Sequence, residues 1–162
     1  MAEPVPLDLY YDNLSEFHGN GERVFYSARG IAVAECYDGH RGQKISVRLY
    51  RAQLAEPDRR RINEVISASR GEDIAIRDRA GIPDEVRDHF AVRSSSGVLR
   101  SFDLWEDDWS KQQPEVLRLK AAALDLLKLL KRRKPEETLQ TRSSGHGPPA
   151  LWPAGFSPDF KP

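Results

Sequence analysis

Residues 114–134 read PEVLRLKAAALDLLKLLKRRK, and this segment constrains the fold more than any other. Almost every residue in it favours a helix, Pro114 suits a first helical turn, and the basic residues 131–134 lie where a helix C-terminus favours positive charge. At about 100° per residue, one face of this helix is apolar, and it comprises Val116, Leu119, Ala123, Leu126, Leu127 and Leu130. Leu117, Leu124 and Leu129 lie on its flanks, so the apolar arc is wider than one contact surface requires.

The first half of the chain has the pattern of strands followed by a helix. Runs with the period of a half-buried strand occupy residues 5–11, 23–28, 31–37 and 44–51. Glycine-containing turns separate these runs, which predicts an antiparallel meander with one face open to water. From Pro57 to Arg70 the period becomes helical, with Ile62, Val65, Ile66 and Ser69 on a narrow stripe that predicts a helix lying on the sheet.

Three further strands are expected before the long helix. They cover residues 73–77, 86–92 and 98–105, and Ser94 to Gly97 forms a hairpin connection between the last two. The predicted fold class is therefore α+β, an antiparallel sheet with two helices packed on one face. We expect residues 1–137 to form a single domain and residues 138–162, rich in Pro and Gly, to form an extended C-terminal tail without a regular element.

The tail carries spaced apolar side chains in its sequence LWPAGFSPDF. Trp152, Phe156 and Phe160 would bind a partner if the segment adds to a sheet edge or inserts into a groove. The alternatives are that the tail folds back over the domain's own apolar surface or stays disordered, as terminal segments commonly do.

Composition and charge exclude several classes of protein. The 25 basic and 25 acidic residues cancel, which does not favour nucleic-acid binding. The single cysteine, Cys36, excludes an internal disulfide and a cysteine-based zinc site. No segment approaches the roughly 20 apolar residues of a membrane span, and residues 1–11 lack the features of a signal peptide, so we expect a soluble cytoplasmic protein without a membrane partner.

The chain offers few groups for an enzymatic site. Its histidines are His18, His40, His89 and His146. Cys36 would pair with His40 in a thiol site, or it is a small core residue on a strand, which the general burial of free cysteine favours. No HExxH, phosphate-binding glycine loop or nucleophile elbow is present. We therefore expect no catalytic residue, no metal and no cofactor.

Three charged clusters have an ordinary structural interpretation beside a functional one. Residues 106–108 are acidic and would bind a hard cation or complement the N-terminus of the long helix. Asp84, Glu85, Asp88 and His89 are titratable neighbours, but Asp88 and His89 point to opposite faces of a strand and do not form a dyad. Arginines 59–61 would clamp phosphates or line a solvated helix face.

From Lys44 to Leu130 the layout resembles that of the emfourin family of small metalloprotease inhibitors. The resemblance consists of a strand (ISVRLYR), a helix (DRRRINEVISASR), a Pro83-Asp84 step before a strand pair that ends in FDLWEDD, and a closing leucine-rich helix. It covers about half of the chain and implies inhibition of a metalloprotease, but it assigns no binding residue.

The sequence thus favours a non-enzymatic binding or interaction protein, accessory or immunity-like, with an unidentified protein partner. The alternatives are an emfourin-like protease inhibitor and a small hydrolase-like enzyme with an unrecognised site. Candidate partner-binding residues are Trp152, Phe156 and Phe160 in the tail and Leu129 on the long helix. Because the apolar arc of residues 114–134 is so wide, this helix is also a candidate homodimer contact.

Overall fold

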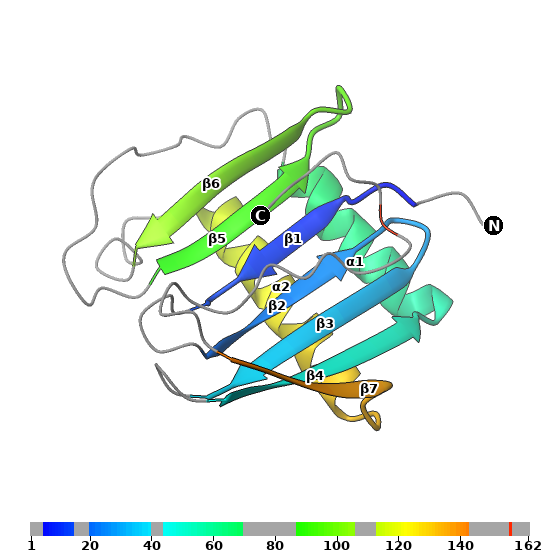
Figure 1. Ribbon diagram of the computed structural model, residues 1–162. Helices are drawn as coiled ribbons and strands as arrows, with labels where there is room; N and C mark the ends of the chain where they lie inside the picture. The colour runs from blue at the N-terminus through cyan, green and yellow to red at the C-terminus, as the bar shows by residue number, and fades with distance from the viewer. Residues whose placement is uncertain are drawn as a thin grey trace.

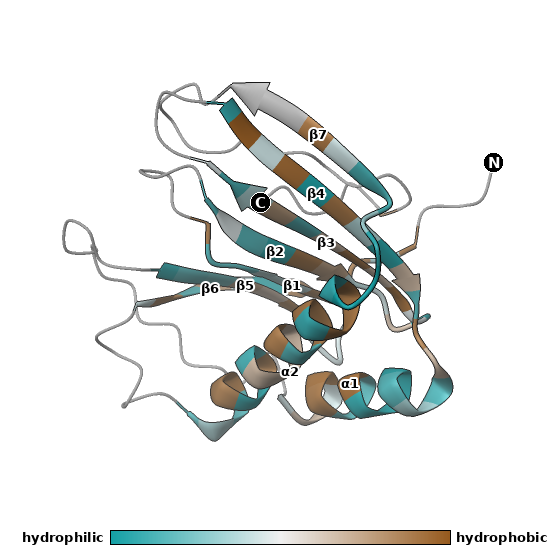
Figure 2. Cartoon of the chain, turned by 90° about the horizontal axis from the view of Figure 1, so that it is seen from below, coloured by the Kyte–Doolittle hydropathy of each residue, from teal (hydrophilic) through white to brown (hydrophobic). Residues whose placement is uncertain are grey.

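The computed structural model describes residues 5–14, 20–39, 44–69, 87–105 and 113–142, together with Phe156. These residues form an antiparallel sheet of seven strands in the order β6-β5-β1-β2-β3-β4-β7, with helices α1 and α2 on one side (Figures 1 and 2). The strands are β1 (Leu9–Asp12), β2 (Gly21–Tyr26), β3 (Ile31–Asp38), β4 (Lys44–Gln53), β5 (Arg87–Arg93), β6 (Leu99–Trp105) and β7 (Glu137–Arg142), and the helices are α1 (Glu56–Ser69) and α2 (Pro114–Lys131). The predicted α+β fold, with both helices on one face of an antiparallel sheet, is confirmed.

Short turns between consecutive strands join the strand pairs that were expected to be hairpins. Between β2 and β3, the backbone N–H of Gly30 donates to the carbonyl of Ser27 over 2.8 Å, and Gly30 has a φ of 96°. Between β5 and β6, Gly97 has a φ of 86° and donates to the carbonyl of Ser94 over 3.0 Å. Both turns need the left-handed backbone that glycine adopts without steric cost. The strand expected at residues 73–77 lies outside the described residues.

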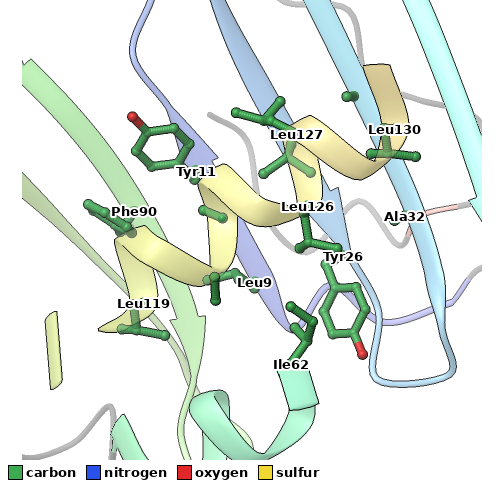
Figure 3. Close-up of a cluster of buried hydrophobic side chains, with 14 of the residues drawn as sticks. Leu9, Tyr11, Tyr26, Ala32, Ile62, Phe90, Leu119, Leu126, Leu127 and Leu130 are labelled. Carbon is green, nitrogen blue, oxygen red and sulfur yellow. The ribbon is translucent and has the colours of Figure 1, made fainter. Parts of the chain in front are cut away.

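Helix α2 lies across the sheet and forms the main core with it. Its buried side chains are Val116, Leu119, Ala122, Ala123, Leu126, Leu127 and Leu130. All six residues of the predicted apolar face are among them, and Figure 3 shows four of the leucines packed among Leu9, Tyr26 and Ile62. The prediction of this face is therefore confirmed.

Helix α1 begins at Glu56 and ends at Ser69, within one residue of the predicted range. Its packing partner is chiefly α2, and Ile62 enters the main core while Val65 and Ile66 are half-buried against it. The Tyr26 hydroxyl also lies 2.5 Å from Asn63 Oδ1, which ties α1 to strand β2. This arrangement explains part of the wide apolar arc of α2, since the buried face packs on the sheet and the flank that carries Leu129 lies beside α1.

The opposite side of the sheet, which we call the outer face, was expected to be open to water, but apolar side chains cover much of it. A second apolar cluster lies there, composed of Val5, Leu7, Tyr10, Phe25, Val33, Ala91 and Phe156. Strand β1 is consequently buried on both faces, as its four successive buried residues show. The prediction of a wet face was wrong because strand alternation separates two faces but does not specify what covers the second one.

The segment after α2 contains a strand that the composition did not predict. Residues 137–142 pair antiparallel with β4, with Leu139 opposite Val47. The expectation of no regular element from Thr138 onward is therefore wrong for residues 138–142, and the boundary placed after Glu137 falls inside β7. Further along, Phe156 makes an isolated parallel bridge with Val5.

Candidate functional site

The surface of α2 that faces away from the sheet and from α1 carries exposed leucines. Leu117 and Leu124 are 40% and 36% exposed. They are seven residues apart and therefore lie on the same side of the helix, two turns from each other. These are two of the flanking leucines that the sequence indicated would need a further contact surface.

Beside Leu124 lies an open groove of about 440 Å³, which we call the α2 groove. Its lining residues come from the C-terminal half of α2 and from the sheet end next to it, and they are Asn13, Glu22, Leu124, Leu127, Lys128, Lys131 and Arg132. Leucine side chains thus lie beside the basic residues of the last helical turns. Basic residues are common in that position because they complement the partial negative charge of the helix C-terminus.

One ion pair connects the two sides of the α2 groove. Lys131 Nζ donates to both carboxylate oxygens of Glu22, over 3.1 and 3.0 Å, and these contacts raise the pKa of Lys131. No ion pair of Lys128 or Arg132 with another described residue is present. The groove therefore keeps a surplus of positive charge after its one carboxylate has been paired.

Cys36 lies beneath this region and does not form a thiol site with any described histidine. Its side chain is buried in the main core, with Sγ 3.6 Å from Glu22 Oε2. Burial, followed by the nearby Glu22 carboxylate, raises the pKa of Cys36 to about 12, so the thiol stays protonated at neutral pH. His89 is on the outer face, and His18, His40 and His146 lie outside the described residues. The interpretation of Cys36 as a core residue is confirmed.

The outer face holds a second polar feature, a line of ionisable side chains across five strands. In register, Asp103 on β6 lies opposite His89 on β5, His89 opposite Asp12 on β1, Asp12 opposite Arg23 on β2, and Arg23 opposite Glu35 on β3. Directly opposite residues of antiparallel strands point to the same face, so these five form one continuous row. We call it the polar row.

The centre of the polar row is an ion pair that is almost completely buried. Arg23 and Glu35 are 1% and 2% exposed, and Arg23 Nε donates to Glu35 Oε2 over 2.7 Å. The Tyr37 hydroxyl donates to the same carboxylate over 2.5 Å, and the guanidinium carbon of Arg23 lies 5.2 Å from the centre of the Phe25 ring. Burial lowers the pKa of Arg23, but Glu35 and the neighbouring tyrosines raise it by more.

Two further contacts complete the polar row, one between Tyr10 and Asp12 and one between His89 and Asp103. The Tyr10 hydroxyl donates to Asp12 Oδ2 over 2.7 Å, and burial raises the pKa of Tyr10. His89 Nδ1 lies 2.5 Å from Asp103 Oδ1. Every charged member of the row thus has a polar partner, which is the condition for burying such groups at tolerable cost.

Asp88 and His89 point to opposite faces, as predicted. Asp88 accepts hydrogen bonds from the Tyr11 hydroxyl over 2.9 Å and from Lys120 Nζ over 2.7 Å, on the side of the sheet that α2 covers. His89 contacts Asp103 on the outer face. The two residues therefore cannot act as a dyad, and Asp84 and Glu85 lie outside the described residues.

The arginine triplet of α1 is engaged in ion pairs rather than arranged as a phosphate clamp. Arg59 and Arg60 both contact Glu56, and Arg61 lies 3.5 Å from Asp58 and 3.6 Å from Asp125 on α2. This arrangement corresponds to a solvated helix face with local charge pairing.

No group of three or more His, Cys, Asp or Glu side chains with metal-binding geometry occurs within the described ranges. The acidic residues 106–108 lie outside those ranges.

The candidate partner-binding residues have different environments. Phe156 is 4% exposed and its ring lies 5.9 Å from that of Phe25, as the self-docking alternative predicted, so its surface is not available to a partner. Leu129 is half-buried in a groove between α1 and α2 that Arg61 and Asp125 also line. Trp152 and Phe160 lie outside the described residues. Dimerisation through α2 stays a prediction.

Sequence reasoning missed the polar row and the link between Glu22 and Lys131. Arg23 and Glu35 occupy positions at which the alternation of the strands predicts exposure to solvent. No local sequence pattern distinguishes a buried charge from an exposed one. Lys131 and Glu22 are separated by 109 residues, so only the packing of α2 over the sheet brings them together.

The described residues form an α+β fold with a seven-stranded antiparallel sheet. No family model matches the chain, no curated protein matches it, and no solved structure matches it. The emfourin resemblance consequently rests on the layout alone. Among the described residues, no helix has both the length and the apolar character needed to cross a membrane.

Proposed function

We propose that this chain is a non-enzymatic binding domain for a protein partner and that the exposed side of α2 is its contact surface. The observation that carries the proposal is the exposure of Leu117 and Leu124 on one side of a helix whose other faces are occupied by the sheet and by α1. Aligned exposed leucines beside a groove are typical of an interaction site, whereas single scattered apolar residues are not.

The surroundings of these leucines support the proposal. The α2 groove continues the apolar strip from Leu124 to Leu127 and is bordered by charged side chains. An apolar centre with a polar rim is the usual anatomy of a protein interface. Because α2 is anchored by seven buried side chains, the surface it presents is held by the core of the domain.

The disposition of reactive groups favours binding over catalysis. Cys36 is buried on the helix side of the sheet, and His89, the histidine that lies in the described ranges, is on the outer face. A nucleophile and a base need to lie within hydrogen-bond reach of each other, and the sheet separates these two.

Metalloprotease inhibition is the specific form of binding that the emfourin resemblance implies. The described elements β4, α1, β5, β6 and α2 follow one another in the order on which that resemblance rests. Titration of the protein against a panel of metalloproteases tests it directly, and unchanged activity across the panel removes inhibition while leaving the general binding role in place.

The test of the α2 surface is a comparison of variants with a partner from the native host. Tagged wild-type protein would be used to identify the partner, which is then purified and titrated by calorimetry against Leu117→Asp/Leu124→Asp. We expect the affinity to fall by at least about tenfold, since charges would enter a desolvated apolar contact.

Val98→Asp is the matched control, because Val98 is 59% exposed in the turn between β5 and β6. It adds the same type of charge at an exposed apolar position away from α2. If the partner binds the double variant as tightly as it binds the wild type, the α2 surface is not the contact site.

A further inference from the structure

We infer that the partner segment that occupies the α2 groove is acidic and amphipathic. This inference rests on the proposed binding function and adds the chemistry of the partner. It follows from two independent properties of the groove, its unbalanced positive charge and its apolar lining.

The charge of the groove is unbalanced among the described residues that line it. Lys128, Lys131 and Arg132 contribute three cations, and Glu22 contributes the single carboxylate, which Lys131 already pairs at 3.0 Å. Exposed Arg133 and Lys134 follow directly along the chain. The chain as a whole has zero net charge, so this concentration of positive charge is local. Carboxylates on a partner would complement it.

Two other grooves of the described structure have closer charge compensation. The groove between α1 and α2 shares Lys128 and Arg132 with the α2 groove, and its third cation, Arg61, contacts both Asp58 and Asp125. The groove along α1 has three arginines beside Glu56 and Glu64. In the groove along α1, Arg59 and Arg60 share Glu56. The α2 groove has three cations beside one carboxylate, whereas each of these two grooves has three cations beside two, so its surplus of positive charge is larger.

The apolar lining distinguishes a protein segment from a simple anion. Leu124 and Leu127 lie in the groove itself, and Leu117 extends the exposed apolar strip toward the N-terminus of α2. Leu117 and Leu124 are about 10 Å apart along the helix axis, given a rise of about 1.5 Å per residue. A partner helix with apolar residues at positions i and i+7 and acidic residues beside them fits both properties.

The inference is tested with a defined peptide and the full chain. The probe is a fluorescein-labelled peptide of repeated Glu-Leu-Leu-Glu-Glu-Leu-Glu units, compared with versions in which Lys replaces Glu or Ser replaces Leu. We expect saturable binding of the acidic amphipathic peptide in fluorescence anisotropy and at least about tenfold weaker binding of both altered peptides. Binding should also weaken as the salt concentration rises.

Two double variants with the same change in charge test the contribution of Lys128 and Arg132, which line the α2 groove and also the edge of the groove between α1 and α2. Lys128→Glu/Arg132→Glu should weaken peptide binding by at least about tenfold, whereas Arg29→Glu/Arg60→Glu, at exposed positions of the groove along α1, should leave it unchanged. Thermal unfolding of both variants confirms that they remain folded. An equal loss in both would show non-specific electrostatics and overturn the inference.

The remaining outcomes also decide the question. Absence of saturable peptide binding overturns the inference but not the proposed function, which depends on the effect of Leu117→Asp/Leu124→Asp on the host partner. A single-stranded oligonucleotide could bind where the peptide does not, with that binding lost in Lys128→Glu/Arg132→Glu. This result would assign the groove to nucleic acid and overturn the inference. Sedimentation equilibrium that shows a dimer lost in Leu117→Asp/Leu124→Asp would assign the groove to a second copy of the chain and would also overturn it.

Discussion

The two faces of the sheet are both buried, but they are stabilised by different interactions. The face under α2 is covered by leucine, alanine and aromatic side chains, with the Asp88–Lys120 ion pair at its margin. The outer face combines a smaller apolar cluster with the polar row, whose central Arg23–Glu35 pair is almost fully buried. The difference shows that one face depends on apolar volume and the other on complete pairing of charges.

The largest expected effect comes from breaking the central pair of the polar row. Arg23→Ala leaves Glu35 as a buried carboxylate without its cation and should destabilise the fold by about 3–5 kcal/mol. Urea unfolding followed by circular dichroism measures the change.

The double variant Arg23→Met/Glu35→Gln is the control for that prediction, because it removes both charges, keeps most of the volume and leaves an acceptor for the Tyr37 hydroxyl. Its stability should be close to that of the wild type or above it. If Arg23→Ala alone costs less than about 1 kcal/mol, the pair is not desolvated and the contrast between the two faces disappears.

A smaller loss is expected from the face that depends on apolar volume. Leu126 points from α2 into the main core and is fully buried. Leu126→Ala should lower the free energy of unfolding by about 2–4 kcal/mol, through lost burial and the cavity it leaves. Leu126→Met, which keeps the volume, should cost less than about 1.5 kcal/mol. An equal loss in both variants would mean that packing volume is not what this face requires.

The smallest effect concerns the pH dependence of Cys36. Because burial raises the pKa of Cys36 from 9.0 to about 12, the folded state disfavours the thiolate. The resulting contribution to stability is complete below about pH 9 and is lost as the pH rises toward 12. Between these values, the free energy of unfolding of the wild type should fall more steeply than that of Cys36→Ala. Parallel curves for the two proteins would show that the thiol is accessible to solvent.

The sequence predicted the parts of the fold that depend on local periodicity. The α2 residues at helical spacing all entered the core, and α1 began and ended within one residue of its expected range. The flanking residues Leu117 and Leu124 were expected to need a further contact surface, and in the folded chain they remain exposed beside a groove.

The parts that were missed depend on contacts between distant segments. Arg23 and Glu35 have the alternation of a solvated strand face, and only their position in the middle of the sheet buries them. Strand β7 is short and polar, and it forms because β4 provides an edge with which it can pair. The charge surplus of the α2 groove likewise depends on where the helix C-terminus lies relative to Glu22.

The location of binding is tested most directly by two-dimensional NMR of the ¹⁵N-labelled protein titrated with the acidic amphipathic peptide. The proposed site predicts that the amide resonances of Glu22, Leu124, Lys128 and Lys131 shift with a common saturation curve, while those of β5 and β6 stay in place. Shifts centred on the outer face, at residues such as His89 and Asp103, with α2 unchanged would contradict the account.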